Sequence, residues 1–217
     1  MREDAYSQSR LAGLARLKRQ GSELRDADSR FAAVAGRMAV ISSPDARARV
    51  VTSHNLFQTP ESIASEMARL AIDGERQLGR TLEPSAGLGR LLRPASAIGW
   101  DSAVAVDVSA DCCRELRLLG IPGLSVRQAD FLSLPVEPGS VDTVLMNPPF
   151  RMGEDIRHIL RAREWLAPGG RLVALCASGE KRLKTLGFLT SSWQELPAKS
   201  FASERTNVSV SLIVMEV

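Results

Sequence analysis

The sequence is poor in the residues from which metal sites and disulfide frameworks are built. Its 217 residues include three cysteines and two histidines. Cys112 and Cys113 are adjacent, Cys176 lies in an apolar run, and the two histidines are far apart. None of these spacings is typical of a zinc site or of a paired Cys–His nucleophile. We therefore predict neither a metal site nor a disulfide framework.

Long hydrophobic runs are also lacking. The longest apolar stretch, residues 172–177, is far shorter than the about 20 residues that a membrane helix needs. The first residues have no apolar centre of the kind found in secretory signals. With 44% apolar and 24% charged residues, the composition is that of a globular protein and not of a disordered chain or a coiled coil. We expect a cytoplasmic protein without membrane contact.

The net charge of +3 is small but unevenly distributed. Residues 1–50 carry 10 Arg and Lys against 6 Asp and Glu, whereas residues 51–217 carry 18 against 19. Apolar side chains recur in the first segment at three- or four-residue steps, at Leu11, Leu14, Leu17, Phe31, Val34 and Met38. We predict a basic helical extension over 1–50. Its arginines form either a solvated helix face or a patch for phosphates.

Residues 51–217 change to short apolar runs separated by helical stretches. This pattern is typical of an α/β fold with a parallel sheet and crossover helices. The expected strands include 81–82, 103–106, 124–126, 141–146 and 172–175.

Two helices and a C-terminal hairpin complete this domain. One helix is expected to follow Thr59 as its cap, with Pro60 in the first turn and an apolar face of Ile63, Met67, Leu70 and Ala71. A second is expected over 154–165, ended by the Pro-Gly-Gly at 168–170. Residues 207–217 read as a strand, and no crossover helix fits between 197–201 and it, so an antiparallel hairpin is expected at the sheet end.

A glycine-containing turn connects the end of one predicted strand to the start of a helix. In Leu82-Glu83-Pro84-Ser85-Ala86-Gly87-Leu88-Gly89, small residues let a ligand approach backbone N–H groups at a helix start. No Gly-Lys-Ser/Thr follows, so this is not a Walker-type phosphate loop. Asp107 ends the next strand, where an acid can accept hydrogen bonds from two ribose hydroxyls. The alternative for Asp107 is the N-cap of the following helix.

A third acid, Asp130, closes the next strand. Glu83, Asp107 and Asp130 are therefore expected along the carboxyl edge of the sheet, where open α/β folds bind ligands. An acidic edge repels a dinucleotide pyrophosphate but suits a cationic sulfonium cofactor with an ammonium group. The pattern favours S-adenosylmethionine over NAD.

The string Asn147-Pro148-Pro149-Phe150 follows the fourth strand. An exocyclic base amine is a poor nucleophile because its lone pair is delocalised into the ring. The side-chain oxygen of Asn147 and the carbonyl of Pro148 can accept its two hydrogens and localise that pair, while Pro149 stiffens the turn and Phe150 can stack on an extruded base. The alternative is a proline-rich turn capped by a core phenylalanine.

Taken in order, these segments resemble the amino-methyltransferases of the gamma motif order, in particular N6-adenine DNA methyltransferases with F-x-T-P, E-P-S-A-G-x-G and N-P-P-[FYW] motifs. The resemblance covers residues 55–217 and implies a class I methyltransferase domain over 51–217, with a seven-stranded, mostly parallel Rossmann-like sheet. It implies that Thr59 and the turn around Gly87 hold the methionine carboxylate of S-adenosylmethionine. The cofactor-binding set is Phe57, Thr59, Glu83, Pro84, Ser85, Ala86, Gly87, Gly89, Asp107, Val108, Asp130 and Phe131, and the target-amine set is Asn147, Pro148, Pro149 and Phe150.

The resemblance implies methyl transfer to an exocyclic amine of a nucleobase, most favourably N6 of adenine in DNA. Only 67 residues follow Phe150, which leaves little room for the target-recognition domain that DNA enzymes of this group usually carry. The Phe form of the catalytic motif also occurs in RNA adenine and guanine amine methyltransferases, so an RNA base is a second hypothesis. A non-catalytic partner subunit that binds cofactor or nucleic acid is a third.

Basic residues near the expected catalytic turn are candidates for contacts with a nucleic-acid backbone. The alternative for Arg151 and the arginines after it is an exposed helix face with paired acids. The candidates for nucleic-acid binding are Arg151, Lys181, Arg182, Lys184 and Asn207. The N-terminal helices are the expected surface for a homodimer or a partner subunit.

Overall fold

The computed structural model describes residues 58–72, 76–198, 200–201 and 208–217. The predicted N-terminal helical extension lies outside these residues, as do the predicted site residues Phe57 and Asn207. None of the helices in the described ranges has the length and apolar character that crossing a membrane requires.

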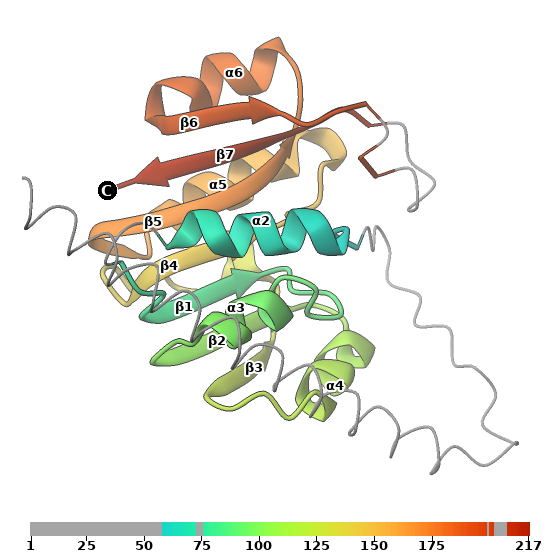
Figure 1. Cartoon of the computed structure of the whole chain (residues 1–217), viewed down its shortest axis with the longest axis vertical. Helices are drawn as coiled ribbons and strands as arrows, with labels where there is room; N and C mark the ends of the chain where they lie inside the picture. The colour runs from blue at the N-terminus through green and yellow to red at the C-terminus, as the bar shows by residue number, and fades with distance from the viewer. Residues whose placement is uncertain (1–57, 73–75, 199, 202–207) are drawn as a thin grey trace, which may run out of the picture. The chain divides into compact units, whose positions relative to one another are not determined.

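Seven strands of the described residues form one sheet (Figure 1). In chain order they are β1 (Arg80–Pro84), β2 (Ser102–Asp107), β3 (Leu124–Gln128), β4 (Val141–Met146), β5 (Leu166–Ala177), β6 (Thr190–Glu195) and β7 (Val210–Glu216). Their spatial order is β3-β2-β1-β4-β5-β7-β6. β7 runs antiparallel to both β5 and β6, and the other neighbours are parallel. The predicted α/β fold with a C-terminal antiparallel hairpin is confirmed.

Helices cover both faces of the sheet. In Figure 1, α2 and α3 cross in front of the strands and α5 lies behind them. The α-helices are α2 (Glu61–Ala71), α3 (Leu92–Ile98), α4 (Ala110–Leu118), α5 (Glu154–Arg163) and α6 (Glu180–Leu186), and the 3-10 turns are η1 (Phe131–Ser133), η2 (Arg151–Gly153) and η3 (Gly187–Leu189). The sheet is thus the middle of three layers, as in other α/β folds.

The central strands β4 and β5 contain continuous apolar runs, at residues 144–146 and 172–177, because both faces of the sheet are covered there. On β5, Val173 and Leu175 belong to the apolar cluster under α2, whereas Leu172 and Ala174 belong to the cluster under α5. β7 shows the same alternation, which explains the continuous apolar run at residues 212–215. These two clusters fix the register that brings the strand ends to one edge.

The start of α2 differs from the prediction. Pro60 is its N-cap and makes no side-chain cap hydrogen bond, so Thr59 does not cap the helix. The buried face consists of Ala64, Met67, Ala68 and Ala71, while Ile63 and Leu70 are only partly buried. Alanines on the inner face let the helix approach β4 and β5 closely, and the bulkier apolar residues lie at its margins.

The end of α5 also differs from the prediction. The helix ends at Arg163, two residues earlier than expected, because Trp165 is already in the turn that leads into β5. The Pro-Gly-Gly at 168–170 lies inside β5, where the pairing with β4 changes register between Val141 and Thr143. The glycines therefore lie in the irregular first part of β5 and do not end α5.

The three cysteines are free and fully buried. Burial raises the pKa of all three thiols, and it raises that of Cys176 to about 12, with a further contribution from the Asp155 carboxylate. Because the thiolate is the reactive form, Cys176 is expected to resist alkylation by iodoacetamide at pH 8 in the folded protein and to react fully in 8 M urea. Mass analysis of peptides checks this, and alkylation of Cys176 in native protein at the rate of a free thiol would contradict it.

Candidate active site

A cavity of about 440 Å³ opens where the carboxyl ends of β1, β2 and β4 meet η1 and the first turns of α5. It collects thirteen of the predicted site residues, which come from five separate segments of the chain. They are Thr59, Glu83, Ser85, Ala86, Gly87, Asp107, Val108, Asp130, Phe131, Asn147, Pro148, Pro149 and Phe150. Among the described residues, no group of three or more His, Cys, Asp or Glu is placed to hold a metal ion.

Two predicted residues of the first turn are not among those that line the cavity. Pro84 is buried at the end of β1 and pairs with Val106 of β2. Gly89 has a φ of +73°, and a Cβ there would come within 2.9 Å of the Leu116 side chain on α4. Both residues therefore shape the turn and its packing.

Asp107 organises the turn after β1. Its Oδ2 accepts a hydrogen bond from the Gly87 N–H over 2.8 Å, and its Oδ1 accepts one from the Ser109 N–H over 2.8 Å. Gly87 has a φ of +55°, which an L-residue rarely adopts. The helix α4 is capped by Ser109, whose hydroxyl accepts from the Cys112 N–H, so Asp107 is not the N-cap.

Glu83 is the least satisfied polar group of the cavity. Its side chain is buried, and its Oε2 has no hydrogen-bond partner among the described residues. Loss of hydration, and then repulsion from the Asp107 carboxylate, raise the pKa of Glu83 well above its usual value. A buried carboxyl group next to a second carboxylate is stabilised by a nearby positive charge. This part of the cavity wall therefore fits a ligand with a cationic group.

Asp130 and Phe131 line the cavity from the segment that follows β3. The Asp130 carboxylate accepts from the Leu132 N–H over 3.0 Å and from the Ser133 hydroxyl over 2.8 Å, so it caps η1. The ring of Phe131 is buried and stacks on His158, with centroids 6.1 Å apart. Both residues are held by these contacts in the wall of the cavity.

Asn147 follows the last residue of β4, and its side chain is bonded to the segment that precedes α2. The Nδ2 of Asn147 donates a hydrogen bond to Thr59 Oγ1 over 3.1 Å, across 88 positions of sequence. This orientation assigns the amide oxygen as the acceptor end of the side chain. Phe150 lines the cavity and also packs against the cluster under α2, so it has the core contact that was the alternative from the sequence, while its stacking on a base stays a prediction.

The four described candidates for nucleic-acid binding, Arg151, Lys181, Arg182 and Lys184, are outside the cavity lining. Arg151 and Lys181 are exposed, and Lys184 forms an exposed ion pair with Glu180 over 2.6 Å. Arg182 instead turns inward and pairs with the buried Asp155. The structure therefore separates Arg182 from the other cationic candidates.

The cavity also contains residues whose place in it the sequence reading did not predict. Glu154, Arg157 and His158 line it from the first two turns of α5. The spacing of three and four residues puts them on one helix face, and α5 begins directly after the Asn147–Phe150 turn. The spacing and the position of the helix together could have indicated that these three residues line the cavity. Further lining residues are Gln58, Leu88, Arg90, Val106, Ala129 and Leu132.

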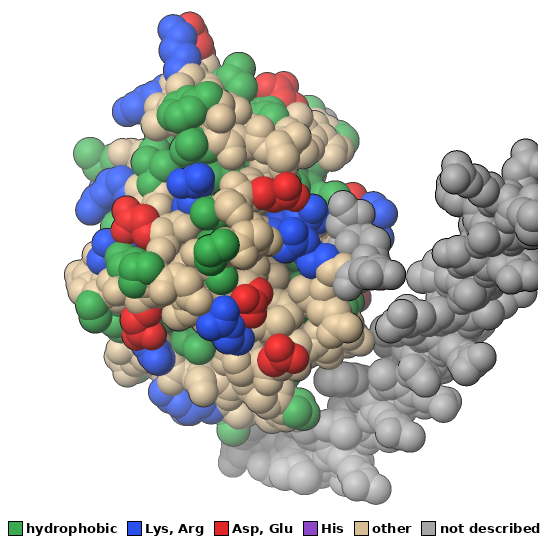
Figure 2. Space-filling model, turned by 90° about the vertical axis from the view of Figure 1, so that its left-hand side faces the viewer, with side chains coloured by type: hydrophobic (Ala, Val, Ile, Leu, Met, Phe, Trp, Pro, Cys, Tyr) green, Lys and Arg blue, Asp and Glu red, His purple; other side chains and the backbone are tan. Residues whose placement is uncertain are grey.

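Figure 2 shows the edge of the sheet at the amino ends of the parallel strands, away from the cavity. Lys and Arg side chains alternate there with Asp and Glu. An example at this edge is the ion pair between Arg80 and Asp142. The guanidinium of Arg80 donates to the Asp142 carboxylate from two nitrogens, over 2.8 and 2.9 Å. The mixture of signs on this face differs from the continuous basic surface that nucleic-acid backbones favour.

Comparison with known proteins agrees with this architecture. Residues 82–174 match the model of a family described as a methyltransferase domain. A search of the curated proteins gives no match.

Solved structures resemble this chain over 72–74% of its length. A Pyrococcus horikoshii protein described as an RNA methyltransferase is 21% identical, with a TM-score of 0.59, and the match covers 74% of this chain and 84% of that one. A SAM-dependent methyltransferase from Aquifex aeolicus is 14% identical (TM-score 0.52; 74% and 90%). TrmN from Thermus thermophilus is 22% identical (TM-score 0.55; 72% and 48%).

The chain therefore has the fold of the S-adenosylmethionine-dependent methyltransferases, and its residues 82–174 match the model of a methyltransferase domain. S-adenosylmethionine is the cofactor that this fold and domain use, in agreement with the acidic cavity.

The raised pKa of Glu83 predicts pH-dependent cofactor binding. A bound ammonium group favours the ionised acid, so the affinity for S-adenosylmethionine is expected to increase as the pH rises from about 4.5 toward the raised pKa and to level off above it. Glu83→Gln is expected to weaken binding by about 10- to 100-fold, the scale of a lost hydrogen bond to a charged group, and to flatten the pH profile.

Titration calorimetry between pH 5 and 9 measures both effects, with Glu195→Gln on the exposed side of β6 as the control. The same shift predicts that the cofactor-free protein loses stability as the pH rises through the raised pKa, because folding then buries the charged form. Equal affinity of wild type and Glu83→Gln at every pH would contradict this assignment.

Proposed function

We propose that this protein transfers a methyl group from S-adenosylmethionine to an exocyclic amine of a nucleobase, most favourably N6 of adenine in DNA. The observation that carries the proposal is the position of Asn147. Its side-chain amide lies in the wall of the same cavity as Glu83 and Asp107, and the amide nitrogen donates a hydrogen bond to the Thr59 hydroxyl. An amide acceptor thus lies in the same cavity as the acids suited to a cationic cofactor.

The cavity residues divide between cofactor and target. The carboxylates of Glu83 and Asp107 suit the ammonium group and the ribose hydroxyls, and Val108 and Phe131 suit the adenine ring, with Asp130 near its amine. When bound, S-adenosylmethionine supplies an electrophilic methyl group. The oxygen acceptors proposed for a target amine are on the Asn147–Phe150 turn, which lines the same cavity.

The turn after β4 supplies what an amine nucleophile lacks. The oxygens of Asn147 and Pro148 accept the two amine hydrogens, which turns the nitrogen lone pair out of conjugation with the ring. Pro148 is buried, and the ring of Phe150 is partly exposed at the cavity, where it can stack on an extruded base. No strong base is needed, because the proton is lost readily once the nitrogen is alkylated.

DNA is favoured over RNA because the sequences of the motifs at Phe57–Pro60 and Glu83–Ala86 resemble those of DNA adenine methyltransferases. RNA is the second candidate, and the observation in its favour is structural likeness. The Pyrococcus horikoshii structure carries the description of an RNA methyltransferase. In either case the nucleic acid is the proposed partner, with Arg151 and Lys181 as exposed cations on η2 and α6.

The central test supplies the protein with labelled S-adenosylmethionine and, separately, with DNA and structured RNA, followed by digestion and mass analysis of nucleosides. The expected product is N6-methyl-2′-deoxyadenosine, released from the DNA sample. Asn147→Ala is expected to lower the transfer rate by at least about 100-fold, as for other pre-organised hydrogen-bonding groups, because the amine loses an acceptor.

Cofactor affinity, measured by calorimetry, is expected to change by less than about threefold in Asn147→Ala, since the acids that suit the cofactor are intact. Gln194→Ala, which removes an exposed amide on β6, is the matched control and is expected to keep full activity. Full activity of Asn147→Ala would refute the proposed chemistry. Methyl transfer to RNA alone would replace DNA as the substrate.

A further inference from the structure

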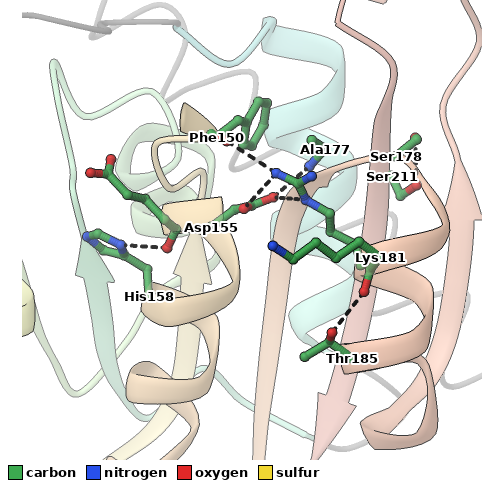
Figure 3. A network of polar contacts seen from close by, with 10 residues as sticks. Phe150, Asp155, His158, Ala177, Ser178, Lys181, Thr185 and Ser211 are labelled. Atoms are coloured by element: carbon green, nitrogen blue, oxygen red, sulfur yellow. Dashed lines mark hydrogen bonds and ion pairs between the residues drawn. The ribbon is translucent and has the colours of Figure 1, made fainter. Parts of the chain in front are cut away.

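The first turn of α5 holds a fully buried carboxylate outside the cavity lining. Asp155 is completely shielded from solvent. Its Oδ2 accepts from the Ala177 N–H at the end of β5 over 3.1 Å and from Arg182 Nε over 3.0 Å, and its Oδ1 accepts from Arg182 Nη2 over 3.1 Å (Figure 3). The charge is thus neutralised by a two-nitrogen contact with the guanidinium.

The same guanidinium reaches the catalytic turn. Arg182 Nη2 also donates to the carbonyl oxygen of Phe150 over 3.3 Å. Figure 3 shows Phe150, Asp155 and Ala177 gathered at this point from three different elements. One side chain of α6 therefore connects the turn after β4 to the start of α5 and the end of β5.

The turn has few local constraints of its own. Met152 has a φ of +51° and Gly153 one of +80°, and α5 begins without a side-chain cap hydrogen bond. Such a backbone keeps one shape only when its surroundings hold it. Outside side chains hold the turn at two points: Thr59 contacts it at Asn147, and Arg182 contacts it at the Phe150 carbonyl, next to Met152 and Gly153.

Energetics favour a positional role for the pair over a purely stabilising one. A buried ion pair often contributes no more stability than apolar residues of equal size, because both charges lose hydration. The planar guanidinium adds a fixed orientation. Its N–H groups point in set directions, so its bonds to Asp155 also fix where the Phe150 carbonyl lies. A lysine at position 182 would keep the charge but would lose this geometry.

We propose that Arg182 and Asp155 are positioning residues that hold the Asn147–Phe150 turn in its amine-binding geometry. This inference rests on the proposed function for its effect on catalysis, and on geometry alone for its effect on the turn. It assigns to Arg182 a role inside the protein in place of the nucleic-acid contact expected from the sequence. The pair acts through the turn and touches neither cofactor nor base.

The test compares Arg182→Lys with Arg80→Lys. Arg80 makes the same two-nitrogen contact with an aspartate, Asp142, but at the opposite edge of the sheet. Arg182→Lys is expected to lower kcat by about 10- to 100-fold, the scale of a displacement of about 1 Å in a reacting group, with KM for nucleic acid and the affinity for S-adenosylmethionine within about twofold of wild type. Arg80→Lys is expected to leave all three unchanged.

Amide hydrogen exchange supplies a readout that needs no activity. The peptide over residues 147–153 is expected to exchange at least about 10-fold faster in Arg182→Lys, and at the wild-type rate in Arg80→Lys, because opening of the turn is no longer opposed. If Arg182→Lys does not fold, Asp155→Asn serves instead, since it keeps an oxygen for the Ala177 amide.

The outcomes separate the two proposals. Unchanged kcat and unchanged exchange in Arg182→Lys would overturn the positioning role. A raised KM for nucleic acid at constant kcat would overturn it too and would show a backbone contact. If wild type methylates no nucleic acid, the proposed function fails, while faster exchange confined to residues 147–153 would still support the hold on the turn.

Discussion

The site depends on one constraint of parallel sheets: the carboxyl ends of neighbouring strands meet at a single edge. In this chain Glu83 is the residue before the last of β1, Asp107 is the last residue of β2, and Asn147 follows β4. The apolar clusters on both faces of the sheet fix the strand register, so the two acids are held close together despite their repulsion. The energetic cost is visible in the raised pKa of Glu83 and in its buried oxygen that lacks a partner among the described residues.

Two buried acids of this fold have opposite electrostatic surroundings. Asp155 has its charge matched within the protein by Arg182 and by the Ala177 amide. Glu83 has no such cation beside it in the described structure, and the cavity in front of it is where positive charge can enter. The contrast follows from what each acid faces: Asp155 faces α6, and Glu83 faces the cavity. A satisfied carboxylate makes the turn rigid, whereas an unsatisfied one is suited to a cationic ligand.

Much of this site could be predicted from the sequence because its signals are local. Apolar runs that end in an acid identify strand ends, and Asn147–Phe150 follows such a run directly. What could not be predicted are contacts between distant segments, which decide how a predicted residue is used. The bond from Asn147 to Thr59 spans 88 positions, and Arg182 lies 27 positions from Asp155. No periodicity in the sequence indicates whether an arginine turns inward or remains in solvent.

The central claim is that the acids and the amide form two ends of one reaction site. A crystal structure with S-adenosylhomocysteine tests it most directly. The account predicts the amino group of the ligand beside Glu83, its ribose on Asp107, and its sulfur on the side of the cavity formed by the Asn147 amide oxygen and the Pro148 carbonyl. A ligand bound elsewhere, or a sulfur turned away from residue 147, would contradict it.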